Sequence, residues 1–350
     1  MMKRRVTLKE VAEQASVSYQ TVSKVINQKV RISPEAEQRI WKAVKDLDYT
    51  PSYTARSLRS QRSQTIGYTW QPSPPDQANP ILDLFLQSMF SSAEQKGYYL
   101  LCFPHRNQKK ILDAYRLLID SGRVDAFVLS SVENDDPCIQ FLCDQNFPFV
   151  AFGRQDGDLH FPYIDVDGGL GIKMAVNHLL SLSHRKIAIL AWPLNSRVGD
   201  NRIEGYFSAM NSAGIEIHPE WVQRGEGTYK IGYSATMKLL SLRENIRPTG
   251  IIAMNDLMAI GAMAAIRHSG LLPGKDIAVT GFDDTPTARY LRPPLTSLRQ
   301  PIWDIGQNLM DRLIEFLESG TYPLPFEELV APQLIIRESS TGLPAQGELL

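Results

Sequence analysis

Ser18-Tyr19-Gln20-Thr21-Val22-Ser23-Lys24-Val25-Ile26-Asn27 is a short segment whose apolar side chains recur at the spacing of a helix. Val22, Val25 and Ile26 fall on one face of that helix, and the opposite face carries amide, hydroxyl and amine groups. A short helix with such a polar face is suited to placing hydrogen-bonding side chains against base edges in a groove of DNA. The segment therefore predicts a helix that contacts DNA.

The residues around this segment predict two further short helices. Thr7-Leu8-Lys9-Glu10 has the pattern of a capping box at the start of the first, and Ser33-Pro34-Glu35 places a serine cap before a proline at the start of the third. A tight turn, Ala15-Ser16-Val17, separates the first helix from the second. Three helices in this order form a helix-turn-helix unit, in which the second helix enters the major groove. The alternative interpretation is a small helical module that binds protein.

The polar residues of this unit divide into two groups. Tyr19, Gln20 and Lys24 lie on the exposed side of the second helix, where glutamine can pair with adenine and lysine can donate to guanine. Short polar side chains at helix ends are suited to phosphate contacts, which fix the register of the protein on the duplex. Those side chains are Thr7, Ser18, Ser23 and Asn27.

Charge is distributed unevenly along the chain. The 350 residues contain 37 Lys and Arg against 38 Asp and Glu, which gives a formal net charge of -1. Residues 1–62 hold 13 basic and 6 acidic side chains, a net charge of +7, so the remaining residues carry -8. A basic head on an acidic body is typical of a protein in which one small domain contacts a polyanion. The length favours two or three folding units.

Cysteine content and hydropathy exclude several classes of protein. Cys102, Cys138 and Cys143 have no metal-ligand spacing, so we expect buried thiols and no bound metal. The basic start leads into an amphipathic segment rather than the apolar core of a secretory signal, and no apolar stretch reaches the length of a membrane span. We therefore expect a cytosolic protein without membrane association, and no residue pattern indicates a cofactor.

The head of the chain closely resembles the lactose-repressor/galactose-repressor (LacI/GalR) family of bacterial transcription regulators at Val6-Thr7-Leu8-Lys9-Glu10-Val11-Ala12 and at Val17-Ser18-Tyr19-Gln20-Thr21-Val22-Ser23. The resemblance continues through Asp48-Tyr49-Thr50-Pro51 and covers nearly the whole chain. It implies that Tyr19, Gln20 and Lys24 read bases. It also implies backbone contacts from Thr7, Ser18, Ser23, Asn27, Ser33 and Tyr49. Many relatives have arginine where this chain has Lys24, and lysine lacks the planar guanidinium fork, so we expect looser base discrimination there.

Residues 51–63 read in isolation as a linker, because so short a helix would be marginal in water. The family resemblance implies instead a hinge helix that folds when two chains lie side by side in the minor groove. In that arrangement Leu58 wedges between base pairs, and Ala55 and Arg56 contact the DNA. Insertion of an apolar side chain kinks the duplex and adds specificity through its deformability. Family members commonly carry asparagine after the proline, and Ser52 retains the cap function.

The remainder of the chain alternates short apolar runs with helical patterns, in two successive series. The first series has strands Thr65–Trp70, 98–103, Ala126–Ser130 and Phe149–Phe152, with helices near 81–96, 108–121 and 137–145. After Tyr163–Val166, the second has strands Ile187–Ala191, Val222–Arg224, Gly250–Ala253 and 277–280, with helices near 168–182, 200–213, 231–242 and 256–269. Such alternation predicts two lobes with parallel sheets, and ligands of such folds lie beyond the carboxyl ends of the strands.

The predicted fold class is therefore an all-α helix-turn-helix head and an α/β body, which the resemblance identifies as a two-lobed domain like the periplasmic binding proteins. The expected domains are a head over 1–50, a hinge over 51–63, a body over 64–340 and a tail over 341–350. The family implies three crossings between lobes, near 162–166, 290–294 and 321–331, with a helix over 301–319 in the first lobe and a strand over 333–337 in the second. Lobe one would comprise about 64–162 plus 294–321, and lobe two about 163–290 plus 327–340.

The resemblance also supplies candidate effector-binding residues. Arg202, in Asp200-Asn201-Arg202-Ile203-Glu204-Gly205-Tyr206, matches the family arginine that clamps sugar hydroxyls or an effector carboxylate. Asn255 and Asp283 match family motifs at the cleft, and Arg154 is a similar case. For the neighbouring Asp256 and Asp284 we expect helix caps instead.

Sugar sites usually include an aromatic side chain that stacks on the ring of the sugar. Five aromatic residues are candidates for this role: Trp70, Phe152, Tyr163, Trp192 and Tyr229. For Trp70 and Tyr163 we favour contact with the sugar over packing in the core. The family often has an aromatic residue where this chain has Gly227, and Tyr229 is a possible replacement.

Three other functions remain alternatives. Asp165-Val166-Asp167 imitates the nucleophile motif of haloacid-dehalogenase-type phosphatases, although it falls mid-chain and leaves the head unexplained. A sugar-binding protein or chemoreceptor is disfavoured by the basic head and the missing signal sequence. A regulator that responds to a purine or to a phosphorylated carrier protein is compatible with the sequence.

The sequence predicts a homodimeric, sequence-specific transcription regulator without catalytic residues. We expect it to repress carbohydrate-utilisation genes by binding a pseudo-palindromic operator in double-stranded DNA, with a sugar or glycoside effector between the lobes. The tail carries no heptads, so a tetramerising coiled coil is not expected.

Overall fold

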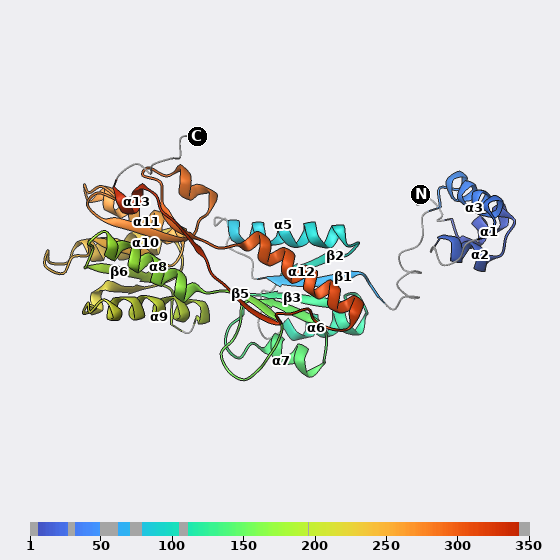
Figure 1. Ribbon diagram of the computed structural model, residues 1–350, viewed down its shortest axis with the longest axis horizontal. Coiled ribbons are helices and arrows are strands. Elements are labelled where there is room, and N and C mark those ends of the chain that lie inside the picture. The colour runs from blue at the N-terminus through green and yellow to red at the C-terminus, as the bar shows by residue number, and fades with distance from the viewer. Residues whose placement is uncertain are drawn as a thin grey trace. The chain divides into compact units, whose positions relative to one another are not determined.

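The computed structural model describes residues 6–26, 32–49, 62–70, 79–104, 111–194 and 196–342 (Figure 1). The chain divides into two compact units, Met1–Ser63 and Gln64–Leu350. Most of the predicted hinge lies outside the described residues, as do Asn27, Ala55, Arg56, Leu58 and the tail beyond Gly342.

The first unit is a three-helix head, as predicted. Its helices are α1 (Leu8–Ala15), α2 (Tyr19–Ile26) and α3 (Pro34–Asp46). Val11, Val22 and Ile40, one from each helix, are fully buried together in its core. The capping box predicted at Thr7 and the serine cap at Ser33 are both present, so the sequence signals that begin two of the three helices are confirmed.

The second unit contains two parallel-dominated sheets, which confirms the predicted fold class. The sheet of lobe one has the order β11-β5-β4-β3-β1-β2 and is parallel throughout. Its strands are β1 (Thr65–Trp70), β2 (Tyr99–Pro104), β3 (Ala126–Ser130), β4 (Phe149–Phe152), β5 (Tyr163–Val166) and β11 (Glu327–Val330). The accompanying helices are α5 (Pro80–Gln95), α6 (Ile111–Asp120), α7 (Pro137–Asp144) and α12 (Ile302–Ser319); α12 lies against α5 (Figure 1).

The sheet of lobe two has the order β12-β10-β9-β8-β6-β7. Its strands are β6 (Ile187–Ala191), β7 (Val222–Arg224), β8 (Gly250–Ala253), β9 (Ala278–Asp283), β10 (Thr296–Arg299) and β12 (Gln333–Ile335). All pairs are parallel except β10 with β12, which is antiparallel. The accompanying helices are α8 (Gly168–Ser181), α9 (Arg197–Ser212), α10 (Tyr229–Leu240), α11 (Asp256–His268) and α13 (Glu338–Thr341), with 3-10 turns at Pro219–Trp221 and Pro286–Tyr290.

Two glycines allow the helix pairs of lobe two to pack closely. A Cβ on Gly205 of α9 would lie 2.1 Å from the backbone oxygen of Gly169 in α8, and one on Gly232 of α10 would lie 2.1 Å from that of Met258 in α11. Contacts this short are sterically impossible, so any larger residue would push the helices apart.

The chain passes between the lobes later than the sequence indicated. The passages occur at Asp167, at Gln300–Pro301 and at Ala331–Pro332, so β5 and β11 belong to lobe one and β10 to lobe two. The predicted lobe limits at 162, 294 and 327 are therefore wrong by a strand each. These limits came from the family resemblance, and the residues of a strand do not by themselves show the neighbour to which it hydrogen-bonds.

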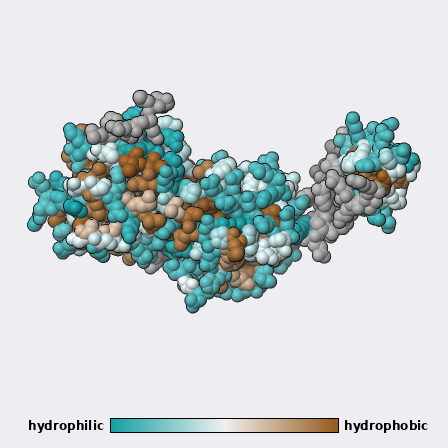
Figure 2. Space-filling model, viewed as in Figure 1, coloured by the Kyte–Doolittle hydropathy of each residue, from teal (hydrophilic) through white to brown (hydrophobic). Residues whose placement is uncertain are grey.

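The surface of the visible face mixes hydrophobic and hydrophilic residues (Figure 2). No helix among the described residues is long and apolar enough to cross a membrane.

Candidate DNA-reading surface and effector cleft

The exposed face of α2 carries the three predicted base-reading side chains. Tyr19 is 50% exposed, and Gln20 and Lys24 are also exposed, because Val22 and Val25 turn the opposite face into the head core. Ser18 accepts a hydrogen bond from the backbone N–H of Thr21 at 3.1 Å and so supports the first turn of α2. The described part of the head thus presents an amide, a phenol and an amine from one short helix.

The predicted phosphate-contacting residues differ in their accessibility. Thr7 and Ser33 are exposed at the N-termini of α1 and α3, where free backbone N–H groups favour anions. Ser23 is partly buried, and Tyr49 is only 7% exposed and packs in the head core. Because Tyr49 is buried, most of its ring packs against the other residues of the head core.

A cavity of about 940 Å³ lies between the lobes of the body. Residues of lobe one that line it belong to or follow β1, β3, β4 and β5, or lie at the start of α5. Residues of lobe two that line it lie at the ends of β6, β7, β8, β9 and β10 or in the segments that follow them. The carboxyl ends of the parallel strands therefore border the cavity, as expected for this type of fold. Charged lining residues are Glu133, Asp165, Arg202, Lys230, Asp256 and Asp283.

Arg202 of α9 lies in the wall of this cavity, as predicted. Its guanidinium lies 3.6 Å from the centre of the Phe282 ring and 4.8 Å from that of Trp192, and Nη1 donates to the carbonyl oxygen of Met254. Burial lowers its pKa to about 10, although the nearby Asp283 and Asp165 carboxylates favour the charged form. Nε is buried without a hydrogen-bond partner among the described residues. The side chain is thus rigidly held with donor capacity left over.

Asp283 ends β9 and also lines the cavity. Its Oδ1 accepts a hydrogen bond from Gln300 Nε2 at 2.8 Å, and its backbone φ of 117° is one that residues other than glycine rarely adopt. Burial raises the pKa of this carboxyl to about 7 against the opposing effect of Arg202. The carboxyl is therefore able to accept or donate a hydrogen bond near neutral pH.

Asn255 lines the cavity as well, but its amide is occupied in holding the wall together. Oδ1 caps α11 by accepting from the N–H of Met258 at 2.8 Å, and Nδ2 donates to the carbonyl of Gly227 at 2.9 Å. The cap of α11, expected at Asp256, is therefore Asn255. Asp256 instead accepts hydrogen bonds from Thr285 and Ser297, and burial raises its pKa to about 6.

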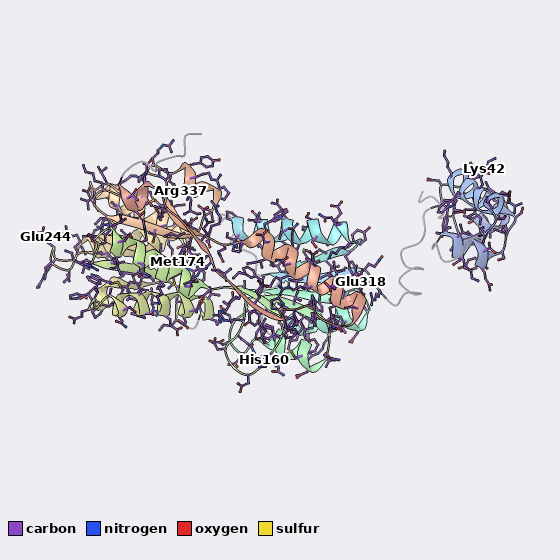
Figure 3. All side chains as sticks on the ribbon, in the orientation of Figure 1. Lys42, His160, Met174, Glu244, Glu318 and Arg337 are labelled. Carbon is purple, nitrogen blue, oxygen red and sulfur yellow. The ribbon has the colours of Figure 1, made fainter. Side chains whose placement is uncertain are left out.

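Asp284, the other expected helix cap, is the centre of a buried ion-pair cluster. Its Oδ1 lies 2.6 Å from Arg337 Nη1 and its Oδ2 lies 2.6 Å from Arg299 Nη2. Arg337, labelled in Figure 3, follows β12, and Arg299 ends β10. Asp284 therefore connects the end of β9 to β10 and β12. The expectation of a cap was wrong, because Thr285 and not Asp284 occupies the N-cap position of the 3-10 turn at Pro286–Tyr290.

Two of the predicted effector residues do not line the cavity, and the side chain of a third lies outside the described residues. Arg154 donates to Asp165 Oδ2 at 2.8 Å and does not line the cavity. Tyr163 begins β5, packs beside Phe161 and is also absent from the lining. Trp70 ends β1, and its side chain lies outside the described residues. Of the aromatic candidates, Phe152, Trp192 and Tyr229 border the cavity.

Sequence reasoning missed Arg197, which joins the two lobes. It is 4% exposed at the first position of α9 in lobe two. Its Nη1 donates to Asp165 Oδ2 at 3.1 Å and its backbone N–H donates to Glu133 Oε2 at 2.7 Å, and both partners belong to lobe one. The helix was predicted to begin at 200, which left Arg197 in a loop; the serine cap at Ser196 was the available signal.

The phosphatase alternative is not supported by these contacts. Asp165 is bound by the guanidinium groups of Arg154 and Arg197, and Asp167 caps α8 by accepting from the N–H of Leu170 at 2.8 Å. No cluster of three His, Cys, Asp or Glu side chains suited to a metal occurs among the described residues. Both aspartates of the motif thus have structural roles: Asp165 forms ion pairs, and Asp167 caps a helix.

The raised pKa of Asp283 predicts a pH-dependent stability of the body. A carboxyl whose pKa is higher in the folded state stabilises the fold below its unfolded pKa, and this stabilisation is lost as the pH rises through the folded value. With a shift from 3.8 to about 7, the loss falls between about pH 4 and pH 8. We expect thermal unfolding temperatures of the wild type to decrease more steeply across this window than those of Asp283→Asn. Parallel curves would contradict the assignment.

Comparisons with known proteins agree with both units. A family model for bacterial regulatory proteins of the lacI family matches residues 7–52, and one for a periplasmic binding protein-like domain matches residues 176–340. The HTH-type transcriptional repressor PurR of Erwinia tasmaniensis is 33% identical over 343 residues, which cover 97% of this chain and 98% of that protein. The chain belongs to the LacI family. As a member, it is a DNA-binding transcriptional regulator.

Solved structures of LacI-family regulators have the same fold. A regulatory protein of this family from Chloroflexus aggregans is 48% identical, with a TM-score of 0.76 over 79% of this chain and 98% of that one. The Lac repressor dimer bound to operator and the anti-inducer ONPF has a TM-score of 0.84 at 29% identity, over 96% and 99% of the two chains. A complex of the regulator CelR with cellobiose has a TM-score of 0.71 at 29% identity, over 96% and 100%.

Proposed function

We propose that this LacI-family regulator is a repressor of carbohydrate-utilisation genes and that a sugar bound between its lobes controls its affinity for the operator. The observation that carries this proposal is the cavity of about 940 Å³, which places Arg202 and Asp283 opposite residues of the other lobe. A cavity of that size is within the range of small-molecule sites. A ligand that contacts both lobes favours one spacing between them, and a difference in affinity for two states is what control requires.

The chemistry of the lining supports a sugar. Arg202 supplies hydrogen-bond donors, and Trp192 and Tyr229 supply aromatic faces. The Asp283 carboxyl can donate or accept a hydrogen bond near neutral pH, because its pKa is raised to about 7. Sugars offer hydroxyl groups that both donate and accept, together with apolar ring faces. The CelR–cellobiose complex has the same fold and shows that one relative binds a disaccharide.

The DNA-binding surface is proposed to be that of two heads in a homodimer, as in the operator-bound Lac repressor dimer. Tyr19, Gln20 and Lys24 would read bases in the major groove, and Thr7, Ser18, Ser23 and Ser33 would contact phosphates. Two heads imply half-sites about one helical turn apart. Binding to bacterial DNA implies action in the cytoplasm. Sedimentation of a tetramer instead of a dimer would contradict this assembly.

The test of the proposed function is a gel-shift titration of the full chain on an operator obtained by selection from random duplexes. Release of the operator by at least one sugar from a panel of mono- and disaccharides is the expected result. Tighter operator binding with sugar would mean corepression, and a response to purine bases alone would overturn the carbohydrate assignment.

Substitutions in α2 should affect the operator selectively. Gln20→Ala removes a bidentate base contact and is expected to cost about 1–3 kcal/mol of discrimination, which weakens cognate binding by about 10-fold to 100-fold and leaves non-specific binding unchanged. Lys24→Arg should sharpen base preference at its position because guanidinium binds in a fork. Gln38→Ala, exposed on α3, is the matched control. Fluorescence anisotropy at one fixed salt concentration measures binding to the cognate operator and to random DNA. Equal losses of affinity for the two would reject base reading by Gln20.

A further inference from the structure

A smaller cavity of about 390 Å³ adjoins the large one. The two cavities share four lining residues: Glu133, Trp192, Ser196 and Gly227. Pro193, Leu194 and Glu226 line only the smaller one, which we call the outer cavity. Because the two cavities share these residues, the outer cavity lies directly beside the large one.

Trp192 is the rigid part of the shared wall. Its backbone N–H contacts Met254 Sδ at 3.2 Å, and its carbonyl accepts from Arg224 Nη1 at 3.0 Å. The indole Nε1 is buried and has no hydrogen-bond partner among the described residues. A buried donor without a partner costs about 1–3 kcal/mol, so an acceptor brought by a ligand is favoured here.

Gly227 is packed tightly between Trp192 and Asn255. A Cβ at this position would lie 2.6 Å from Asn255 Nδ2 and 3.0 Å from Trp192 Nε1. Asn255 has little freedom to move, since it caps α11 and also donates to the carbonyl of Gly227. Any side chain at 227 would therefore crowd the wall that the two cavities share.

The charges around the outer cavity favour hydroxyl groups over anions. Its lining includes two carboxylates, Glu133 and Glu226, and no lysine or arginine among the described residues. Glu133 is fixed by the N–H of Arg197, which donates to Oε2 at 2.7 Å. Sugar hydroxyls donate well to carboxylates, whereas a phosphate group would meet like charge.

We propose that the outer cavity is a second subsite and that the effector is an uncharged carbohydrate of at least two linked rings. One ring occupies the cavity at Arg202 and Asp283, and the next occupies the outer cavity on the other side of Trp192. This inference rests on the proposed function as a sugar-controlled regulator, and Leu194, which lines only the outer cavity, is the residue that tests it.

The test measures binding of disaccharides to the full chain by isothermal titration calorimetry, each compared with its own component monosaccharides. The panel includes cellobiose and glucose, and it includes cellobiose 6-phosphate as the anionic probe. We expect one disaccharide to bind roughly tenfold or more tightly than its components, and a phosphorylated form to bind more weakly than its parent. Equal or tighter binding of a monosaccharide overturns the second subsite and retains sugar control. Absence of binding by every sugar overturns the proposed function as well.

Two variants test the place of the second ring. Leu194→Ala, at a residue 66% exposed that lines only the outer cavity, should weaken disaccharide binding by about tenfold and leave the component monosaccharide within about twofold. Leu272→Ala is the matched control, because Leu272 is 53% exposed and lines neither cavity. Equal losses for both sizes of ligand in Leu194→Ala would contradict the proposal.

Discussion

Asp284→Asn is expected to lower the free energy of unfolding of the body by about 3–5 kcal/mol, the usual cost of removing one partner of a buried ion pair. The variant leaves Arg337, whose side chain is 5% exposed, without its carboxylate, while Arg299 at 45% can turn to solvent. Asparagine is the informative replacement because it tolerates the left-handed backbone of residue 284, at a φ of 48°. Urea denaturation followed by circular dichroism measures the change.

The matched control for this substitution is Asp113→Asn. Asp113 pairs with Arg116 at 3.4 Å on the surface of α6, where both side chains are more than half exposed. Exposed pairs contribute about 0–1 kcal/mol, so this variant should unfold almost as the wild type does. Similar losses in the free energy of unfolding for the two variants would show that burial of the Asp284 ion pairs does not determine how much they stabilise the body.

Arg202→Lys is expected to weaken the response to the sugar effector by roughly 100-fold, while operator binding without effector is retained. Lysine keeps the positive charge beside Asp283, but it lacks the planar group that lies on Phe282 and the several donors of a guanidinium. The quantity to measure is the effector concentration that releases half of the operator.

Arg154→Lys is the control for that experiment. Both arginines were candidate effector residues, yet Arg154 binds Asp165 and does not line the cavity. We expect a change of less than about threefold in its effector response. If Arg154→Lys loses the response and Arg202→Lys keeps it, the cavity between the lobes is not the effector site.

Local sequence signals predicted the elements of this fold well. Strands such as Ala126–Ser130 and Gly250–Ala253 match the structure residue for residue, because each contains a short apolar run that begins after a polar residue. Helix starts were found where a cap and a proline occur together, as at Ser33. Where neither rule applied, the limits were less accurate: α9 begins three residues before the predicted 200.

Long-range features of the fold were not readable from periodicity. The membership of β5 in lobe one depends on its pairing with β4 and β11, and neither pairing has a local signature. The same holds for the site. Arg202 and Asp283 were candidates from the family resemblance, and both line the cavity. Arg154, a candidate of the same kind, instead donates to Asp165, a partner that only the folded chain brings near it. The ion pairs of Asp284 join residues far apart in sequence for the same reason.

The passages between the lobes are short enough to dictate how the body can deform. The elements on either side are separated by one residue at Asp167 and by two at Gln300–Pro301 and Ala331–Pro332. Consecutive Cα atoms are about 3.8 Å apart, so the ends of β11 and β12 cannot separate by more than about 11 Å. Three such tethers forbid the sliding of one lobe along the other and leave only swinging about an axis close to Pro332. Distance probes placed beside the tethers should hardly move on effector binding, while probes at the far rims should report nearly the whole angular change.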